Sequence, residues 1–180
     1  LWAVPYLREV HGMERTLGTY HTSVMIIGFA VGSLVVGTLS DRMGRRLPLM
    51  RLLGAINVAC WIPWLAGWPM PLAASFTLCT LMGLSISGAS LSWTCAKEVN
   101  PPELAGTATS VVNTGGFLGP AVYQPLVGWV LDLSSGGAAR AFEDWQRALG
   151  VLFAFALAGL ASAFLVRETH GRNVYVAPPR

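Results

Sequence analysis

The sequence predicts an all-α membrane protein, a polytopic bundle of about five complete transmembrane helices and one partial helix. Of its 180 residues, 53% are hydrophobic and only 12% are charged, against roughly 25% charged in an ordinary soluble domain. The mean hydropathy is +0.54. The charges also gather in short islands between long apolar runs, whereas a soluble protein distributes charge over its whole surface.

Five apolar runs are long enough to cross a bilayer, because about 20 helical residues span about 30 Å of hydrocarbon. The predicted helices cover roughly 22–40, 47–67, 71–95, 107–131 and 145–166, followed by a tail over 167–180. The opening LWAVPYL is too short to span, and the end of a further helix is the favoured interpretation, with an interfacial segment as the alternative. Barrel strands are not predicted, because the runs exceed the roughly ten residues of such a strand and lack polar and apolar alternation.

Turn residues separate these runs in order along the chain. The first run ends in GTLSDRMGRR, which starts at Gly37, and the second ends at GWPMP, which starts at Gly67. The third run ends before NPPE at Asn100, and the fourth ends at DLSSGG at Asp132. Within the runs, Gly28 with Gly32 and Gly115 with Gly119 are spaced four apart, which allows helix backbones to approach closely in lipid.

The net charge of +3 does not indicate a nucleic-acid partner, because the basic residues lie at the ends of apolar runs and form no block. If successive helices alternate in direction, eight basic residues fall on the side of the Asp41 loop and four on the other. The eight are Arg42, Arg45, Arg46, Arg51, Lys97, Arg167, Arg172 and Arg180, and the four are Arg8, Arg15, Arg140 and Arg147. The positive-inside rule then predicts that the Asp41 loop and the C-terminus are cytoplasmic, with the protein in the plasma (inner) membrane.

An enzyme is not predicted, because the chain shows no nucleophile with a base, no acid pair and no cluster with metal-ligand spacing. No cofactor or metal is therefore expected. Cys60, Cys79 and Cys95 lie inside apolar runs and are interpreted as small buried hydrophobic residues. The nine acids lie in loops or at helix ends, and His11, His21 and His170 are expected at the surface, outside the membrane.

The most specific segment is the loop Gly37-Thr-Leu-Ser-Asp41-Arg42-Met-Gly44-Arg45-Arg46. It resembles the signature loop of the major facilitator superfamily, which reads G, three residues, D, R or K, any residue, G and two basic residues. The resemblance implies half of a twelve-helix transporter.

Two further features resemble the C-terminal half of that family. The run Glu168-Thr169-x-Gly171-Arg172 is similar to the family's sequence after its last helix. The helix predicted at 71–95 lacks the arginine that the N-terminal half usually carries in its fourth helix. The chain from 1 to 180 therefore resembles the C-terminal six-helix half, helices seven to twelve, with the first truncated.

The resemblance also implies roles for charged residues. Asp41 is expected to face the end of a helix in the missing N-terminal half, and Arg45 to pair with Glu98. Both contacts would stabilise the outward-facing state and break as the halves rock.

The implied function is secondary active transport of a small solute by alternating access. The partners are the lipid bilayer, the missing half, and a coupling proton or ion where transport is coupled. The alternatives are a non-transporting membrane sensor or assembly protein with the same fold, because fold does not determine function, and a homodimer of half-transporters.

The substrate cavity is predicted beside the run from Ser110 to Trp129, because such sites lie near the midplane beside broken helices. Pro120 and Pro125 each remove a backbone donor, and Gly119 thins the helix at the same level. Three polar side chains in this run are the candidate cavity contacts: Asn113, Tyr123 and Gln124. Hydrogen bonding between helices is the alternative role for each of them. Since no acid is expected at the midplane, a titrating group for proton coupling is expected outside this chain.

Overall fold

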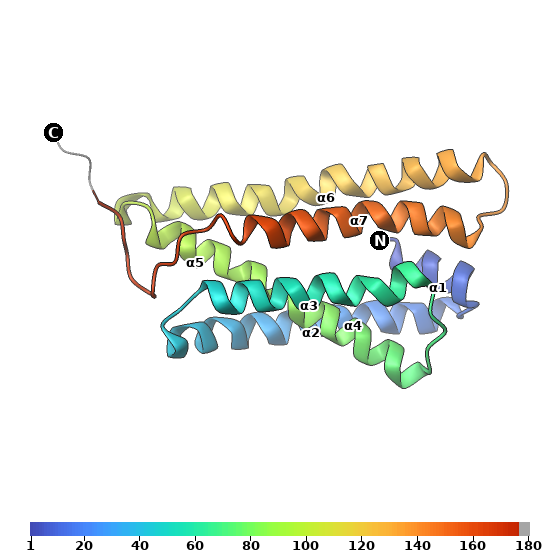
Figure 1. Cartoon of the computed structure of the whole chain (residues 1–180), viewed down its shortest axis with the longest axis horizontal. Coiled ribbons are helices and arrows are strands. Elements are labelled where there is room, and N and C mark those ends of the chain that lie inside the picture. The colour runs from blue at the N-terminus through green and yellow to red at the C-terminus, as the bar shows by residue number, and fades with distance from the viewer. Residues whose placement is uncertain (177–180) are drawn as a thin grey trace.

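The computed structural model describes residues 1–176, and every regular element in that range is a helix (Figure 1). The α-helices are α1 (Ala3–His11), α2 (Arg15–Met43), α3 (Leu47–Ala66), α4 (Leu72–Ile86), α5 (Leu91–Glu98), α6 (Ala105–Ser135) and α7 (Phe142–Ser162). Two short 3₁₀ helices, η1 (Ser87–Ser90) and η2 (Pro102–Leu104), flank α5. The predicted all-α bundle is therefore confirmed over the described residues.

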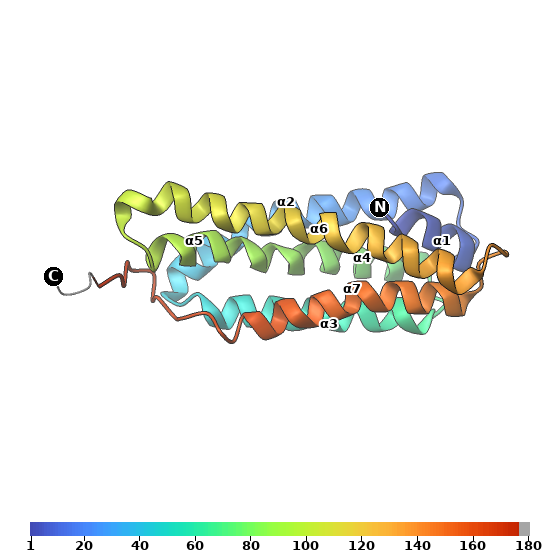
Figure 2. The same ribbon diagram turned by 90° about the horizontal axis from the view of Figure 1, so that it is seen from above.

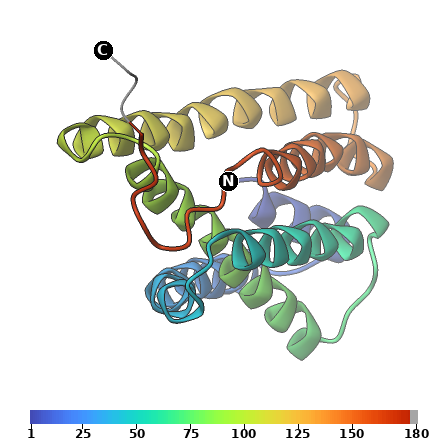
Figure 3. The same ribbon diagram turned by 60° about the vertical axis from the view of Figure 1, so that its left-hand side comes forward.

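The long helices run roughly along the long axis of the molecule (Figures 1 and 2). Helices α6 and α7 pack together, α7 also contacts α3, and α1 lies against α2. The segment from α4 to α5 crosses obliquely between these groups, so that α4 packs on α2 and α3 whereas α5 packs on α6 (Figure 3). This crossing brings the end of α5, the α2–α3 loop and the C-terminal segment to the same end of the molecule (Figure 1).

The helix predicted over 71–95 is interrupted by η1. Its sequence, SGAS, supplies two serines whose hydroxyls bond back to the chain: Ser87 Oγ donates to the Leu84 carbonyl at 2.6 Å, and Ser90 Oγ to the Ser87 carbonyl at 2.7 Å. Such back-bonding favours bends in helices. The 3₁₀ turn lies where the segment passes from α2 and α3 toward α6.

Close backbone approach holds α2 against α4. A Cβ added at Gly28 would lie 2.7 Å from the Thr80 carbonyl oxygen, and one added at Gly83 would lie 1.9 Å from the Met25 carbonyl oxygen. Gly32 similarly meets Ser87. The spacing of Gly28 and Gly32 therefore has the packing role predicted for it. Gly115, by contrast, has no atom within 4 Å of its added Cβ among the described residues.

Within residues 1–176, four segments are long and apolar enough to cross a membrane: Arg15–Met43, Leu47–Ala66, Leu72–Glu98 and Phe142–Ser162. Helix α6 has sufficient length, at 31 residues, but its middle contains amides, prolines and several glycines that make it less apolar. It extends beyond the predicted range of 107–131, as α2 does beyond 22–40. The last helix ends at Ser162, four residues before the predicted 166.

Candidate functional site

The loop between α2 and α3 is only three residues long. Gly44 follows the last residue of α2 with φ of 60°, and its N–H donates to the Asp41 carbonyl at 3.1 Å. This left-handed conformation is one that glycine adopts without steric cost. Helix α3 begins at Leu47 with Pro48 in its first turn, where a missing N–H costs nothing. The charged residues are therefore held in a tight turn between two helix ends.

Arg46 lies at the centre of this turn, with a side chain only 6% exposed. Its Nη1 donates to Asp41 Oδ1 at 2.5 Å and to Ser40 Oγ at 3.0 Å. Its Nη2 donates to Glu98 Oε1 at 2.7 Å, while its Nε donates to Glu98 Oε2 at 3.3 Å. The guanidinium thus binds Glu98 through two parallel hydrogen bonds, the arrangement its planar shape favours.

The charge of Arg46 is stabilised by these partners. The hydrogen bonds to Glu98 raise the pKa of Arg46 above its ordinary value, burial opposes the rise, and Asp41 adds to it. The two acids are not equally buried, because the Asp41 side chain is 68% exposed and that of Glu98 only 12%. Water screens an exposed ion pair, so Glu98 is the stronger partner.

Glu168, from the segment after α7, binds the N-terminus of α3. Its carboxylate accepts the backbone N–H groups of Arg46 at 2.9 Å and Leu47 at 3.0 Å, and those of Thr169 and His170 at 3.1 Å. Burial would raise the pKa of Glu168, but these four hydrogen bonds outweigh it and lower the pKa to about 2. A carboxylate at a helix N-terminus also compensates the positive end of the helix dipole.

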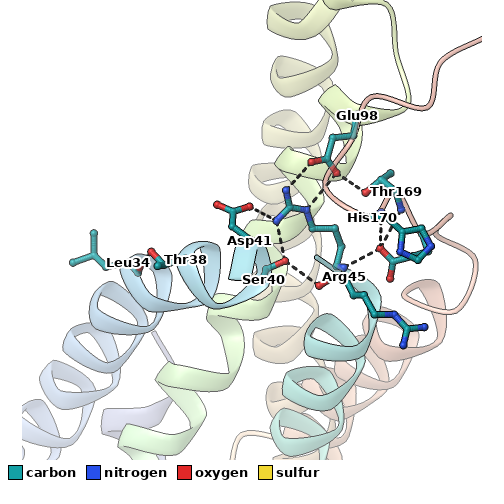
Figure 4. Close-up of polar contacts among 10 residues, drawn as sticks. Leu34, Thr38, Ser40, Asp41, Arg45, Glu98, Thr169 and His170 are labelled. Atoms are coloured by element: carbon teal, nitrogen blue, oxygen red, sulfur yellow. Dashed lines mark hydrogen bonds and ion pairs between the residues drawn. The ribbon is translucent and has the colours of Figure 1, made fainter. Parts of the chain in front are cut away.

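The C-terminal segment is attached to α5 as well. The Thr169 hydroxyl donates to Glu98 Oε2, and the Val174 N–H donates to the Glu98 carbonyl at 2.7 Å. Asn173 Nδ2 reaches the carbonyls of Lys97 and Asn100 at 3.1 and 2.9 Å. Three segments far apart in sequence therefore meet around one arginine (Figure 4). We call this the Arg46 network, defined by Ser40, Asp41, Arg46, Glu98, Glu168 and Thr169.

The expected pairing of Arg45 with Glu98 is wrong by one position. Arg45 is exposed, and its carbonyl accepts the Ser40 hydroxyl at 3.2 Å. Neighbouring side chains in a turn point in different directions, so that only Arg46, which precedes α3 directly, is directed toward α5. Arg42 is also exposed. The sequence contained Glu168 and Thr169 in its family-like run but gave no signal that they meet Arg46.

Gly37 has no atom within 4 Å of an added Cβ among the described residues. Gly37 therefore has no close neighbour within residues 1–176. The helix end expected to face Asp41 also stays a prediction. Arg180, counted among the basic residues of the tail, lies outside the described residues.

The predicted cavity residues are separated by the structure. A cavity of about 630 Å³ lies among α1, α3, α4, α6 and α7, and its walls include Gly119, Pro120, Tyr123 and Gln124. Asn113 is exposed on α6 and does not line this cavity, and neither does Pro125. Helix α6 continues through both prolines.

The cavity walls are mainly aromatic and apolar, and the residues that line it include no charged side chain. Two of the residues that line this cavity carry a buried polar atom without a hydrogen-bond partner among the described residues: Trp64 at Nε1 and Gln124 at Oε1. Asn57, also on the wall, donates to Ser85 Oγ at 3.0 Å and so joins α3 to α4. Leu1 and Trp2 form part of the same wall.

The predicted surface position of His21 is also wrong. Its side chain is 0% exposed and lies between α2 and α4, rather than at the surface. The error came from its position at the start of an apolar run, where helix α2 in fact extends two turns further toward Arg15. No pattern in the sequence pairs it with Ser75, its partner on α4.

Two curated proteins are similar to the chain. The "Ascochitine biosynthesis cluster MFS transporter" of Didymella fabae is 28% identical over 163 residues, which cover 89% of this chain and 29% of that protein. The "Membrane sensor protein UhpC" of Salmonella typhimurium is 29% identical over an alignment of 186 residues, which covers 94% of this chain and 38% of that protein. The chain therefore spans well under half the length of either relative. No solved structure matches it significantly.

The family model described as "Major Facilitator Superfamily" matches residues 1–177. This match covers nearly the whole chain, and the apolar helical bundle agrees with an integral membrane protein. The turn between α2 and α3 carries the loop that first indicated the family. The chain belongs to the major facilitator superfamily.

Proposed function

We propose that this chain is the C-terminal half of a secondary transporter that carries a small solute across the membrane by alternating access. Helices α2 to α7 then correspond to the eighth to twelfth helices of the family, with α4 and α5 together forming the tenth. The partial coverage of both relatives and the Glu168 run after the last helix support this assignment. The missing N-terminal half is the expected partner, and no catalytic role is assigned.

The Arg46 network is the observation that carries the proposal. Alternating access requires two states of comparable free energy that rocking of the halves interconverts. A buried arginine that joins the α2–α3 loop, α5 and the C-terminal segment stabilises one arrangement of this end of the molecule. Breaking a buried ion pair by removing one partner costs about 3 kcal/mol. A free-energy change of this size is large enough to shift the equilibrium between two transport states by more than tenfold.

We propose that the network faces the cytoplasm. Seven basic residues of the described chain belong to the end of α2, the α2–α3 loop, the start of α3, the end of α5 and the segment after α7, which meet at this end (Figure 1). Four belong to α1, the first residue of α2, the α6–α7 loop and the start of α7 at the other end (Figure 1). The seven are Arg42, Arg45, Arg46, Arg51, Lys97, Arg167 and Arg172. The positive-inside rule places the richer end in the cytoplasm, which is consistent with a plasma (inner) membrane location.

The test compares two neighbouring substitutions, Arg46→Gln and Arg45→Gln, in the full-length protein reconstituted into vesicles. Both remove one positive charge from the same loop, so any effect of charge on membrane topology is matched. Because each lost charged hydrogen bond is worth about 1.5–3 kcal/mol, uptake of a transported solute should fall at least tenfold in Arg46→Gln. Arg45→Gln should retain nearly full uptake. Equal uptake rates in the two variants would rule out this role of the network.

A membrane sensor is the second candidate function, favoured by the similarity to the sensor protein of Salmonella typhimurium. A sensor would bind its solute and change conformation without accumulating it. Uptake should then be absent across a broad panel of solutes, although a solute would still protect the protein against thermal unfolding. Solute accumulation inside the vesicles would favour the transporter.

A further inference from the structure

Both ring nitrogens of the buried His21 have oxygen partners. Nδ1 lies 2.8 Å from the Leu17 carbonyl oxygen on the same helix, and Nε2 lies 2.8 Å from Ser75 Oγ on α4. A carbonyl oxygen only accepts hydrogen bonds, so Nδ1 carries a hydrogen. The Ser75 hydroxyl also lies 3.0 Å from the Leu72 carbonyl. The serine therefore has two alternative targets for its single proton.

The hydrogen bonds around the histidine can be satisfied in two protonation states. In the neutral state, Nε2 accepts the Ser75 hydroxyl proton. In the charged state, Nε2 donates to Ser75 Oγ, and the hydroxyl rotates to donate to the Leu72 carbonyl at 3.0 Å. Neither state leaves a buried polar atom of these groups unpaired, which would be destabilising. A proton can thus be bound by rotation of one hydroxyl, without movement of either helix.

An aromatic ring and a small cavity adjoin the imidazole of His21. The Phe76 ring stacks on the imidazole, with centroids 4.0 Å apart and an angle of 17° between the planes. The face of an aromatic ring attracts a cation. A small cavity beside His21 has room for about one water molecule, and its walls include Tyr6 and His11 from α1.

The titratable groups that face this cavity are Tyr6, His11 and Cys79, and its described walls contain no Asp, Glu, Lys or Arg. His11 is half-buried, and its Nε2 lies 3.4 Å from the Tyr6 hydroxyl. His11 ends α1, and α1 lies at the end of the molecule opposite the Arg46 network (Figure 1).

We propose that His21 and Ser75 form a proton-binding site between α2 and α4, which is loaded from the end of the molecule opposite the Arg46 network. The proton comes from water beside His11 and is held at Nε2, while the Ser75 proton turns to the Leu72 carbonyl. Charge-assisted hydrogen bonds are about twice as strong as neutral ones. The bound proton therefore strengthens the hydrogen bond between His21 on α2 and Ser75 on α4. Its use in coupling rests on the transport function proposed above, whereas proton binding does not.

The experiment follows the imidazole nitrogens by ¹⁵N NMR in histidine-labelled protein in lipid nanodiscs. The His21 signals are identified by their loss in His21→Gln. As the pH falls from about 9 to about 4.5, a range that spans ordinary histidine titration, the ring should pass from the Nδ1–H tautomer to the doubly protonated form. A ring that keeps one neutral tautomer throughout, in folded protein, would overturn the proposal.

Ser75→Ala tests the role of the hydroxyl. The charged ring loses a stronger hydrogen bond than the neutral ring, by about 1.4 kcal/mol, so protonation should need about tenfold more protons. The matched control is Thr77→Ala on the same helix, because Thr77 Oγ1 bonds only to the Ala73 carbonyl at 2.8 Å and is exposed. It should leave the titration unchanged. An equal titration in Ser75→Ala and in the unmodified protein would overturn the assignment of Ser75. A failed titration leaves solute uptake, measured separately, unaffected.

Discussion

At the scale of single residues, one buried side chain determines the structure of the signature loop. Arg46 binds acids from α2 and α5, while its own backbone N–H is bound by Glu168 from the C-terminal segment. Arg42 and Arg45, with the same charge, are exposed. The difference is one of direction and not of chemistry, because only Arg46 stands at the first turn of α3.

The carboxylate of Glu168 makes the attachment of the C-terminal segment dependent on pH. Its pKa falls from an ordinary value of 4.5 to about 2 in the folded state. Above pH 4.5, the ionised carboxylate contributes its full stabilisation to the attached segment. This contribution is lost as the pH falls toward the pKa of about 2 in the folded state. Amide hydrogen exchange of residues 167–176 should therefore accelerate between about pH 4.5 and pH 2, after correction for intrinsic exchange rates. In Glu168→Gln the protection should be low already at pH 7, and a protected, pH-independent segment in this variant would contradict the prediction.

Gly44 is needed for its backbone conformation and not for space. Its φ is 60°, and an added Cβ would meet no atom within 4 Å. Gly44→Ala should therefore lower the free energy of unfolding by about 1–2 kcal/mol, the cost of a left-handed residue with a side chain. Gly106→Ala is the control, because Gly106 also has open space but lies in α6 with ordinary helical geometry. There the substitution should be neutral or stabilising. Thermal unfolding in one detergent distinguishes the two.

At the scale of helices, the backbones of α2 and α4 approach each other closely. Gly28 and Gly83 approach backbone atoms of the opposite helix, where no side chain can be accommodated. Van der Waals packing of this kind is the main attraction between helices in lipid. The same pair of helices holds His21 and Ser75, so that the proton-binding site lies within a rigid contact.

Gly83→Ala should be strongly destabilising, because its Cβ would fall 1.9 Å from the Met25 carbonyl oxygen. The helices must separate, at a cost of about 1–3 kcal/mol or more. Gly150→Ala on α7 has no atom within 4 Å and serves as the control. The melting temperature should fall by several degrees in Gly83→Ala and stay unchanged or rise in Gly150→Ala. Similar melting temperatures for both variants would show that α2 and α4 leave room for a side chain at residue 83.

Helix α6 differs from its neighbours. Its glycines at 115 and 116 meet no other helix among the described residues, and large apolar side chains such as Phe117, at 71%, are exposed. Tyr123 and Gln124 line the cavity, whereas Asn113 lies on the exposed surface. The α6 residues that line the cavity run from Gly115 to Gln124, so Asn113 lies beyond the cavity along the helix, which a list of polar residues does not reveal.

At the scale of the whole molecule, the two ends carry different polar structures. One end holds the Arg46 network, and the other holds α1 and the α6–α7 loop (Figure 1). Tyr6 and His11 of α1 line the small cavity beside His21. The bundle between them is apolar. If the ends face opposite sides of the membrane, the protonation of His21 and the state of the Arg46 network respond to different compartments.

Labelling from the two sides of the membrane tests this orientation. Arg42→Cys is exposed at the Arg46 end, and Ala139→Cys is exposed in the α6–α7 loop. The native cysteines Cys60, Cys79 and Cys95 are buried and serve as an unreactive background. An impermeant thiol reagent should modify Ala139→Cys in intact cells and Arg42→Cys only after the cytoplasmic side is opened. The reverse pattern would contradict the positive-inside assignment.

The sequence by itself determined the all-α membrane bundle, the family and the position of the signature loop. These features depend on run length, charge distribution and local spacing, which a linear chain displays directly. The tertiary structure decided which arginine meets Glu98, how Glu168 reaches α3, and that His21 lies buried against Ser75. Such contacts join residues separated by 52, 121 and 54 positions. They depend on the directions of side chains and on the oblique crossing of α4 and α5, neither of which local spacing specifies.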